Sequence, residues 1–251
     1  MDRLAIGLAG ASGKLGRSIM ALALHDPDLR IVCGVGRSSC LGEDLGKLAG
    51  KEEIGLYLSD DCDELFEKSS LVIDVSTADN LQNLLTRACQ MKKPLVVGTT
   101  GHSEGGFRLM SQASQSIPLF HSPNFSLGLT ALAGAVSLLS RILGAYDVKI
   151  VETHHIHKKD RPSGTALKLS EAIGEACGKE PPIESQRTGE VIGEHTVTFS
   201  TEEEQVSVTH RALTREVFAK GALLAVKFLA RQPPGLYSMP ELLGNPSLCA
   251  M

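Results

Sequence analysis

The sequence predicts an α/β protein: a doubly wound parallel sheet with a smaller α+β domain inserted into it. Three observations support this prediction. Short apolar runs alternate with stretches of helical spacing over the first 120 or so residues. The first of these runs ends in a glycine-rich turn, Gly10–Arg17. After about Asn124 the pattern changes to a long apolar stretch followed by alternating segments, and the 251 residues suffice for two cores.

The first part of the chain carries five strand signals in order. These are Leu4–Ala9, which ends at glycine, and then Arg30–Val35, Leu71–Val75, Leu95–Val97 and Pro118–Phe120. Apolar residues with helical spacing mark the helices Leu15–Leu24, Ala78–Met91 and Glu104–Ser116. Because helices separate successive strands, we expect the strands to pair in parallel.

The second part begins with a long apolar stretch, Leu127–Leu143. It contains Ser137, Ser140 and Arg141 and is short for a membrane span, so we expect a buried helix. A strand at Asp147–Thr153 and a helix at Gly164–Cys177 follow. Alternating polar and apolar residues then predict antiparallel strands with one wetted face. They are Thr196–Ser200 and Gln205–Thr209, before a last helix at Phe218–Leu229.

The composition limits the possible function classes. Hydrophobic residues make up 42% and charged residues 22%, with a net charge of -4, which argues against nucleic-acid binding by bulk charge. The six cysteines are scattered without a C-x-x-C pair, which favours free thiols in a reducing compartment. The first residues lack the form of a signal peptide, and we expect a cytoplasmic protein with no membrane partner.

The turn after the first strand has glycines at Gly10, Gly13 and Gly16, the spacing G-x-x-G-x-x-G. Glycine lets the backbone approach a pyrophosphate, and the following helix offers free N–H groups to it. We therefore expect Gly10, Ala11, Ser12, Gly13, Lys14 and Leu15 to bind a dinucleotide. A glycine-rich turn without a ligand is the alternative. A Walker phosphate loop is excluded because Leu15 follows Lys14.

The end of the second strand bears on the choice of cofactor. An acidic residue there would bind the ribose of NADH, but the sequence is Val35-Gly36-Arg37-Ser38-Ser39. Arg37, helped by a serine, could instead face the 2′-phosphate of NADPH. We expect a preference for NADPH over NADH. The alternative is that Arg37 is a solvated loop residue.

Other turns follow strands of the same predicted sheet. In open α/β sheets the ligand lies beyond the carboxyl ends of the strands. We therefore place in the cofactor crevice Ser76, Gly98, Thr99, Thr100, Ser122, Asn124 and Phe125. Each turn alone could be purely structural.

The densest group of titratable residues is His154-His155-Ile156-His157-Lys158-Lys159. Histidine titrates near neutral pH and can act as a general acid, while lysine binds carboxylates. Ser163-Gly164-Thr165 lies at an expected helix start, where N–H groups bind anions. Together they predict a pocket in which a small acidic substrate receives a proton during hydride transfer. A solvated basic loop is one alternative. A metal site is another, but we expect no metal, because no acidic or cysteine ligand accompanies the run and lysines repel cations.

The segment Glu152–Ala166 carries the pattern E-x-H-H-x-x-K-x-D-x-P-S-G-T-A without a break. In this pattern, and in Gly98–Gly101, Asn124–Ser126 and Gly189–Thr196, the chain resembles the 4-hydroxy-tetrahydrodipicolinate reductase (dihydrodipicolinate reductase) family. The resemblance covers nearly the whole chain. It implies a Rossmann-like dinucleotide-binding domain over residues 1–124 and 216–251. Residues 125–215 would form an inserted α+β domain for substrate binding and tetramerisation.

The resemblance also implies roles for individual residues. His154 would be the general acid, Lys158 would assist catalysis and bind substrate, and His155 would bind substrate. Ser163, Gly164 and Thr165 would hold a substrate carboxylate, and His157 receives no role. Gly36 departs from the acid that many relatives have, which leaves Arg37 as the cofactor discriminator.

The activity implied is NAD(P)H-dependent reduction of 4-hydroxy-tetrahydrodipicolinate, a small dicarboxylate, to tetrahydrodipicolinate in diaminopimelate and lysine biosynthesis. The protein would be a cytoplasmic homotetramer. Another Rossmann-fold dehydrogenase of small molecules and a non-enzymatic nucleotide-sensing protein are the alternatives. An acylating dehydrogenase would need a nucleophilic cysteine, and none lies near the histidine run in the sequence.

Overall fold

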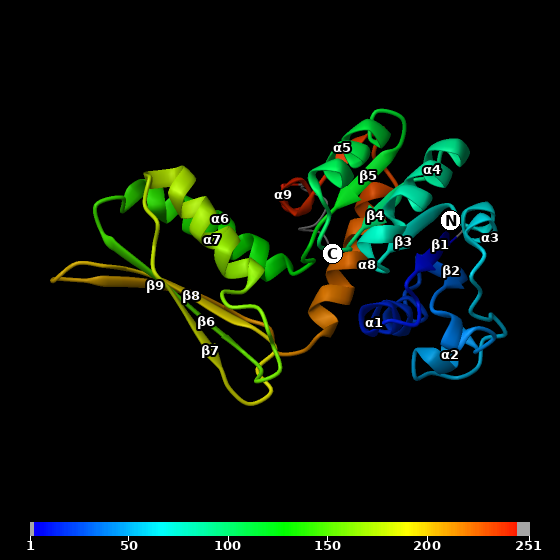
Figure 1. Ribbon diagram of the computed structural model, residues 1–251, viewed down its shortest axis with the longest axis horizontal. Helices are drawn as coiled ribbons and strands as arrows, with labels where there is room; N and C mark the ends of the chain where they lie inside the picture. Colours follow the sequence, from blue (N-terminus) through cyan, green and yellow to red (C-terminus); the bar gives the residue numbers. More distant parts are fainter. Residues whose placement is uncertain (1–2, 245–251) are drawn as a thin grey trace. The chain divides into compact units, whose positions relative to one another are not determined.

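A computed structural model describes residues 3–244, and Figure 1 shows its helices and strands. The chain divides into two compact units. One contains the chain up to Phe125 together with the chain from Glu216 onward, and the other is Ser126–Arg215. The chain thus leaves the first unit after Phe125 and returns to it at Glu216.

The first unit is built on six parallel strands in the order β10-β5-β4-β3-β1-β2. Strand β1 lies between β2 and β3, so the strand order reverses beside it, and this is where open α/β sheets bind ligands. The strands are β1 (Leu4–Ala9), β2 (Leu29–Val35), β3 (Leu71–Asp74), β4 (Leu95–Val97), β5 (Pro118–His121) and β10 (Gly235–Tyr237).

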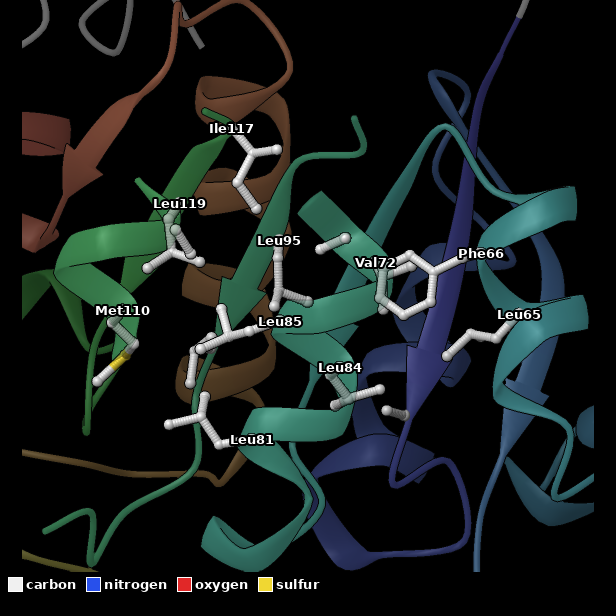
Figure 2. Close-up of a cluster of buried hydrophobic side chains, with 14 of the residues drawn as sticks. Leu65, Phe66, Val72, Leu81, Leu84, Leu85, Leu95, Met110, Ile117 and Leu119 are labelled. Carbon is white, nitrogen blue, oxygen red and sulfur yellow. The ribbon is translucent and has the colours of Figure 1, made fainter. Parts of the chain in front are cut away.

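Helices cover both faces of this sheet. Helices α1 (Lys14–Ala23) and α8 (Glu216–Leu229) pack against each other on one face. The other face is covered by α3 (Cys62–Lys68), α4 (Leu81–Met91) and α5 (Glu104–Ala113), and Figure 2 shows the apolar core between them and the sheet. Short elements complete the unit: α2 (Leu45–Leu48), α9 (Met239–Leu243) and the 3-10 turns Ser38–Cys40 and Ala78–Asn80.

The second unit has a four-stranded sheet in the order β7-β6-β8-β9. Its strands are β6 (Asp147–His154), β7 (Ile183–Arg187), β8 (Glu194–Ser200) and β9 (Gln205–Arg211). Helices α6 (Leu127–Ile142) and α7 (Gly164–Cys177) pack together over one face, around a core that includes Val136, Ile150, Leu169 and Phe199. The opposite face carries hydroxyl pairs between strands, such as Thr196–Thr209 at 2.9 Å.

The predicted fold class is confirmed, and the predicted helices and strands are found within a few residues of their expected ends. Four short elements, α2, α3, β10 and α9, were not predicted, and three further features differ. Strand β7 was not predicted, because Ile183-Glu184-Ser185-Gln186-Arg187 has a single apolar residue. It pairs in parallel with β6, so the sheet is mixed rather than antiparallel. A 3-10 turn precedes α4 where a continuous helix was expected.

The expectation of a buried helix at Leu127–Leu143 was wrong. Helix α6 buries only one stripe, Leu132, Val136 and Ser140, while Leu138 is 51% and Ile142 67% exposed. Among residues 3–244, no helix combines the length and the apolar character that a membrane span requires. The five cysteines in the described part of the chain are free thiols, and the sixth, Cys249, lies outside it.

Candidate active site

The turn after β1 can be formed only by glycine at its critical positions. Gly10 has φ +86°, and a Cβ there would lie 2.6 Å from the carbonyl of Val75 at the end of β3. A Cβ on Gly16 would lie 2.2 Å from the carbonyl oxygen of Gly10. Because these glycines have no Cβ, the turn can pack closely against the point where the strand order reverses, as a dinucleotide site requires.

Helix α1 begins at this turn with its first N–H groups available. Gly13 takes the cap position in an extended conformation, and among the described residues no side chain caps the helix there. No acidic residue lies in the first turn of α1, and Lys14 is exposed. Uncapped N–H groups and the positive end of the helix dipole favour a bound anion. The turn therefore fits the pyrophosphate of a dinucleotide.

Backbone hydrogen bonds tie the neighbouring turns to one edge of the sheet. The amide of Gly10 donates to Val35 at 2.9 Å, and that of Val75 donates to Ala9 at 2.9 Å. The amide of Gly98 donates to Asp74 at 2.7 Å, and that of Ser122 to Val97 at 3.0 Å. The turns that follow β1, β3, β4 and β5 thus lie along the same carboxyl edge, where the sequence placed the cofactor residues.

The proposed cofactor residues differ in exposure. The side chains that lie in the protein interior are those of Ala11, Ser12, Thr99, Ser122 and Phe125. Phe125, for example, is 2% exposed, and its ring fills the space that a Cβ on Gly98 would occupy. These residues shape the turns from within. The side chains of Lys14, Arg37 and Thr100 are exposed, and Leu15, Ser76, Gly98 and Asn124 are partly exposed.

The packing of the turn after β2 explains why Gly36 stands where a dinucleotide site can have an acidic residue. The hydroxyl of Ser12 accepts a hydrogen bond from the amide of Arg37 at 3.2 Å. A Cβ on Gly36 would lie 2.6 Å from that hydroxyl oxygen and 3.2 Å from Leu58, so a side chain there would displace Ser12. The next residue, Arg37, is exposed and is the cation of this turn.

Asp74, at the end of β3, is a fully buried carboxyl that sequence reasoning did not single out. It accepts hydrogen bonds from the amide of Ser76 at 2.9 Å, the hydroxyl of Ser76 at 2.5 Å and the hydroxyl of Thr99 at 3.3 Å. Burial raises the pKa of Asp74 despite these donors. Asp74 thereby joins two of the predicted cofactor turns.

In the second unit, His154 is the last residue of β6, and its ring is fixed by Glu152. The two lie two residues apart on a strand, so their side chains share a face. His154 Nδ1 is hydrogen-bonded to Glu152 Oε2. The other carboxylate oxygen, Oε1, accepts from Arg187 Nη2 at 2.8 Å and from the amide of Ser163 at 3.3 Å. Glu152 is fully buried and joins three segments of the unit.

Ser163, at the start of α7, faces inward. Its hydroxyl accepts from the amide of Ala166 at 3.2 Å and lies 3.2 Å from Nε2 of His195, which is opposite Glu152 on β8. Ser163 is 2% exposed, so its side chain is committed to the helix cap. The exposed Gly164 and the half-buried Thr165 present the free N–H groups of the helix start.

The loop between β6 and α7 carries the remaining basic residues. Lys158 Nζ lies 2.9 Å from Asp160 Oδ2, and its side chain is 23% exposed. His155 is partly exposed and His157 exposed, with their rings 6.2 Å apart. The charge of Lys158 acts on the ring of His154, and Glu152 joins that ring to the start of α7, so these residues belong to one cluster, while His157 lies on the solvent side.

Burial and charge set the protonation of this cluster. Burial, with a smaller contribution from the neighbouring His154, lowers the pKa of His195 to about 4, so the ring is neutral at pH 7. Burial also lowers the pKa of His154, against the pull of Glu152. Burial alone would raise the pKa of Glu152, but hydrogen bonds from Arg187 and its neighbours outweigh it, and the pKa is lowered. The pair is therefore a carboxylate facing a neutral imidazole.

The statement that no acidic ligand accompanies the histidine run was wrong. Ligand-type atoms of Glu152, His154 and His195 lie within 4.8 Å of one another, a group that could hold a metal ion. Yet the guanidinium of Arg187 lies 2.8 Å from the same carboxylate, and a cation there would be repelled. The charge distribution favours proton chemistry at this cluster over metal chemistry.

Sequence reasoning gave no role to Glu152, Arg187 or His195. The spacing of Glu152 and His154 could have shown that they touch, because residues i and i+2 of a strand point the same way. His195 belongs to an alternating strand whose partner cannot be derived from local sequence. Arg187 lies in the strand that was not predicted.

A glycine-rich turn that fits a dinucleotide, together with a buried carboxylate–histidine pair beside a lysine, is typical of an oxidoreductase. The profile of the dihydrodipicolinate reductase N-terminus matches residues 4–125, and that of the C-terminus matches residues 128–243. The chain belongs to the dihydrodipicolinate reductase family.

Individual relatives agree. A 4-hydroxy-tetrahydrodipicolinate reductase of Halorhodospira halophila is 33% identical, covering 96% of this chain and 99% of its own. One of Hahella chejuensis is 36% identical, covering 97% and 99%. Among solved structures, a dipicolinate-bound dihydrodipicolinate reductase from Paenisporosarcina sp. TG-14 has the same fold, with a TM-score of 0.79 at 20% identity over 94% of this chain and 98% of its own.

Proposed function

We propose that this chain converts 4-hydroxy-tetrahydrodipicolinate to tetrahydrodipicolinate: the substrate loses water to give a cyclic imine, which takes up a hydride from NADPH and a proton. We also propose that His154 and Lys158 serve this reaction. The observation that carries the proposal is the cluster around Glu152: a hydrogen-bonded histidine, a nearby lysine and the start of α7, where Ser163 caps the amide of Ala166 and leaves those of Gly164 and Thr165 available. The family to which the chain belongs supports the reaction.

His154 would supply the proton. Its Nδ1 is bonded to Glu152, so the proton that can leave is the one on Nε2. The pKa of His154 is lowered by burial, so Nε2 is unprotonated in the free protein near pH 7. A dicarboxylate substrate adds negative charge beside the ring and favours the imidazolium, which is the form that can act as a general acid.

Lys158 and the start of α7 would hold the two carboxylates. The ammonium of Lys158 already pairs with the carboxylate of Asp160, so an anionic substrate would compete with that partner. The N–H groups of Gly164 and Thr165 suit a second carboxylate, because they stand at the positive end of a 14-residue helix. His155 lies on the same loop and would complete the substrate contacts.

The cofactor residues would act mainly through backbone. A bound nicotinamide would supply the hydride. Gly10, Gly13 and the first turn of α1 would hold the pyrophosphate, and the turns after β3, β4 and β5 would hold the nicotinamide end. The exposed Arg37, in a turn without carboxylates, would contact a 2′-phosphate, which supports NADPH over NADH.

The central test is substrate-dependent oxidation of NADPH by the purified protein and by His154→Ala and Lys158→Ala. We expect each variant to lose roughly 100-fold or more in kcat, because proton transfer and substrate orientation are lost. The Kd for NADPH, measured by fluorescence, should stay within about twofold of wild type. Near-normal turnover in both variants would contradict the assignment, and no turnover in wild type would contradict the function.

The cofactor preference is tested with Arg37→Ser. Loss of one charged hydrogen-bonding partner should lower kcat/KM for NADPH roughly 10-fold or more and leave that for NADH nearly unchanged. Lys14→Ser is a suitable comparison, because the pyrophosphate is common to both cofactors and both values should fall together. An equal loss for the two cofactors in Arg37→Ser would reject the preference.

The remaining proposals concern assembly and location. We propose a cytoplasmic homotetramer in which Ser126–Arg215 provides both substrate binding and subunit contacts. The face of its sheet opposite α6 and α7 carries short hydroxyl side chains, including Thr196, Thr198 and Ser207, which allow close approach of another sheet. Light scattering during size-exclusion chromatography should give four times the 26.7 kDa mass of the chain. A monomer at micromolar concentration would oppose this.

A further inference from the structure

Arg187 ends β7 and lies opposite His154 in the parallel pairing of β6 and β7. Its side chain is 2% exposed, although arginine is rarely buried without a reason. Each guanidinium nitrogen is bonded. Nη2 donates to Glu152 at 2.8 Å and to the carbonyl of Asp160 at 2.5 Å, Nε donates to the carbonyl of Lys158 at 3.3 Å, and Nη1 donates to the carbonyl of Gln186 at 2.6 Å.

These bonds connect the two residues assigned to the reaction. Glu152, held by Arg187, is the partner of His154 Nδ1. The carbonyls of Lys158 and Asp160 belong to the loop that carries the Lys158 ammonium. The guanidinium is therefore bonded on one side to the group that orients the proton donor, and on the other to the backbone of the substrate-binding lysine.

Stability alone does not account for this arrangement. Burying an ion pair costs desolvation, and apolar residues of similar size commonly stabilise a core as well or better. The same sheet has a pair at its surface, Arg211 and Glu194 at 2.6 Å, with side chains 61% and 24% exposed, which contacts neither His154 nor Lys158. The buried pair differs in that its further bonds all go to the segment Glu152–Ser163 or to its own strand.

We propose that Arg187 is a positioning residue for the reaction, aligning His154 through Glu152 and placing Lys158 through the backbone of its loop. This inference rests on the proposed function. A planar guanidinium can bond Glu152 and two carbonyls at once, whereas an ammonium on a flexible stem cannot. Arginine at this position is therefore a specific requirement and not simply a positive charge.

The charged and titratable groups that face His154 determine how its titration should respond. They are Glu152 on the same strand, Arg187 on β7, the neutral His195 on β8, and Lys158 with Asp160 in the loop. Of these, Glu152 is the acid in contact with the ring, and its charge favours the imidazolium. A general acid is active while protonated, so activity falls as pH rises through the pKa of His154.

The experiment compares Arg187→Lys and Glu152→Gln, with Arg211→Lys and Glu194→Gln as controls on the same sheet. Arg187→Lys should lower kcat/KM for 4-hydroxy-tetrahydrodipicolinate roughly 100-fold, the cost of misplacing reacting groups by about 1 Å. Glu152→Gln should shift the alkaline limb of kcat/KM to lower pH by about one unit, because the charge that favours the imidazolium is removed. The controls should change neither value by more than about twofold.

A second measurement does not depend on turnover. With histidine labelled at Cε1 and the His154 signal assigned from His154→Gln, NMR titration of the whole protein reports the protonation of this ring directly. Glu152→Gln should lower the titration midpoint of His154, because the charge that favours the imidazolium is removed. If Arg187→Lys fails to fold, Glu152→Gln, which keeps the size and one acceptor oxygen, still provides the test.

The outcomes separate three cases. Wild-type kcat/KM in Arg187→Lys, or an unmoved His154 titration in Glu152→Gln, overturns the positioning role. Loss of kcat/KM that disappears when rates are normalised to protein able to bind NADPH shows a purely structural role and also overturns it. If wild type oxidises no NADPH with the substrate, the proposed function fails, and the NMR result then decides alone whether Glu152 governs His154.

Discussion

The two sites of this chain are built in opposite ways. The dinucleotide turn is made by leaving side chains out: a Cβ on Gly10, Gly16 or Gly36 would lie within 2.6 Å of another atom. The cluster around His154 is made by putting charged side chains in, since Glu152 and Arg187 are almost completely buried. One site offers backbone N–H groups and the other offers titratable groups.

This difference predicts what each site tolerates. A site made of backbone dipoles keeps its charge distribution across the pH range, because N–H groups do not titrate there. Its weakness is volume, since even a methyl group meets backbone. A site made of buried acids and bases has the opposite properties: it tolerates substitutions that keep size and charge but responds strongly to any change of charge.

The largest expected effect follows from removing a buried charge. Glu152→Ala would leave the guanidinium of Arg187 buried without its carboxylate, which costs about 3–5 kcal/mol of unfolding free energy. Glu194→Ala removes the acid of the exposed pair on the same sheet and should cost under about 1 kcal/mol. Urea unfolding followed by circular dichroism measures both. Equal losses would show that burial does not distinguish the two pairs.

The next effect comes from adding a methyl group to the turn. In Gly10→Ala, the left-handed conformation costs about 1–2 kcal/mol for an L residue and overpacking costs about 1–3 kcal/mol. We therefore expect the unfolding free energy to fall by about 3 kcal/mol. Gly42→Ala is the matched control, because its φ is +79° and, apart from Gly42 and its two chain neighbours, no described atom lies within 4 Å of the added Cβ. It should cost about 1 kcal/mol and leave NADPH binding intact.

In Gly10→Ala, NADPH affinity measured by fluorescence should fall together with stability, because the turn cannot keep its position against Val75. A variant that is as stable as Gly42→Ala and binds NADPH normally would show that the turn can move aside. The comparison therefore tests volume in the first unit as the Glu152 variant tests charge in the second.

The sequence predicted these two regions unequally. Strand β1 and its turn were predicted correctly, because an apolar run, a glycine pattern and a helix signal are all local. The sequence could not distinguish buried residues such as Ser12 from exposed ones such as Arg37. Their burial depends on the residues of β2 and β3, which pair with β1 over long sequence separations.

For the candidate catalytic cluster, the sequence predicted only the residues that are contiguous in the chain. His154, Lys158 and the start of α7 lie in one segment, and the structure keeps them together. Arg187 and His195 come from other strands. Strand β7 pairs in parallel with β6 and has a single apolar residue, so neither its existence nor its register with His154 could be derived from local pattern. Long-range pairing places the residues that tune the site.

The smallest effect concerns the pH dependence of stability, which we expect to come from the buried histidines of the second unit. The unfolded chain binds a proton at His195 below its ordinary pKa of 6.5, while the native chain binds it only below about 4. Falling pH therefore favours unfolding across this window, and the loss levels off below it. At pH 5 the contribution of His195 amounts to about 2 kcal/mol relative to pH 7.5. The pKa values of His154 and His210 are also lowered by burial, which acts in the same direction.

Urea unfolding at pH 7.5 and pH 5 measures this loss, and His195→Gln is the informative variant. Glutamine can keep a hydrogen bond to Ser163 but does not titrate, so the difference between the two pH values should shrink by about 2 kcal/mol. His25→Gln, at an exposed position between α1 and β2 in the other unit, should leave the difference unchanged. If His195→Gln lost as much stability on acidification as wild type, the acid sensitivity would have to arise from other residues. The titration of His195 would then not distinguish the second site from the first.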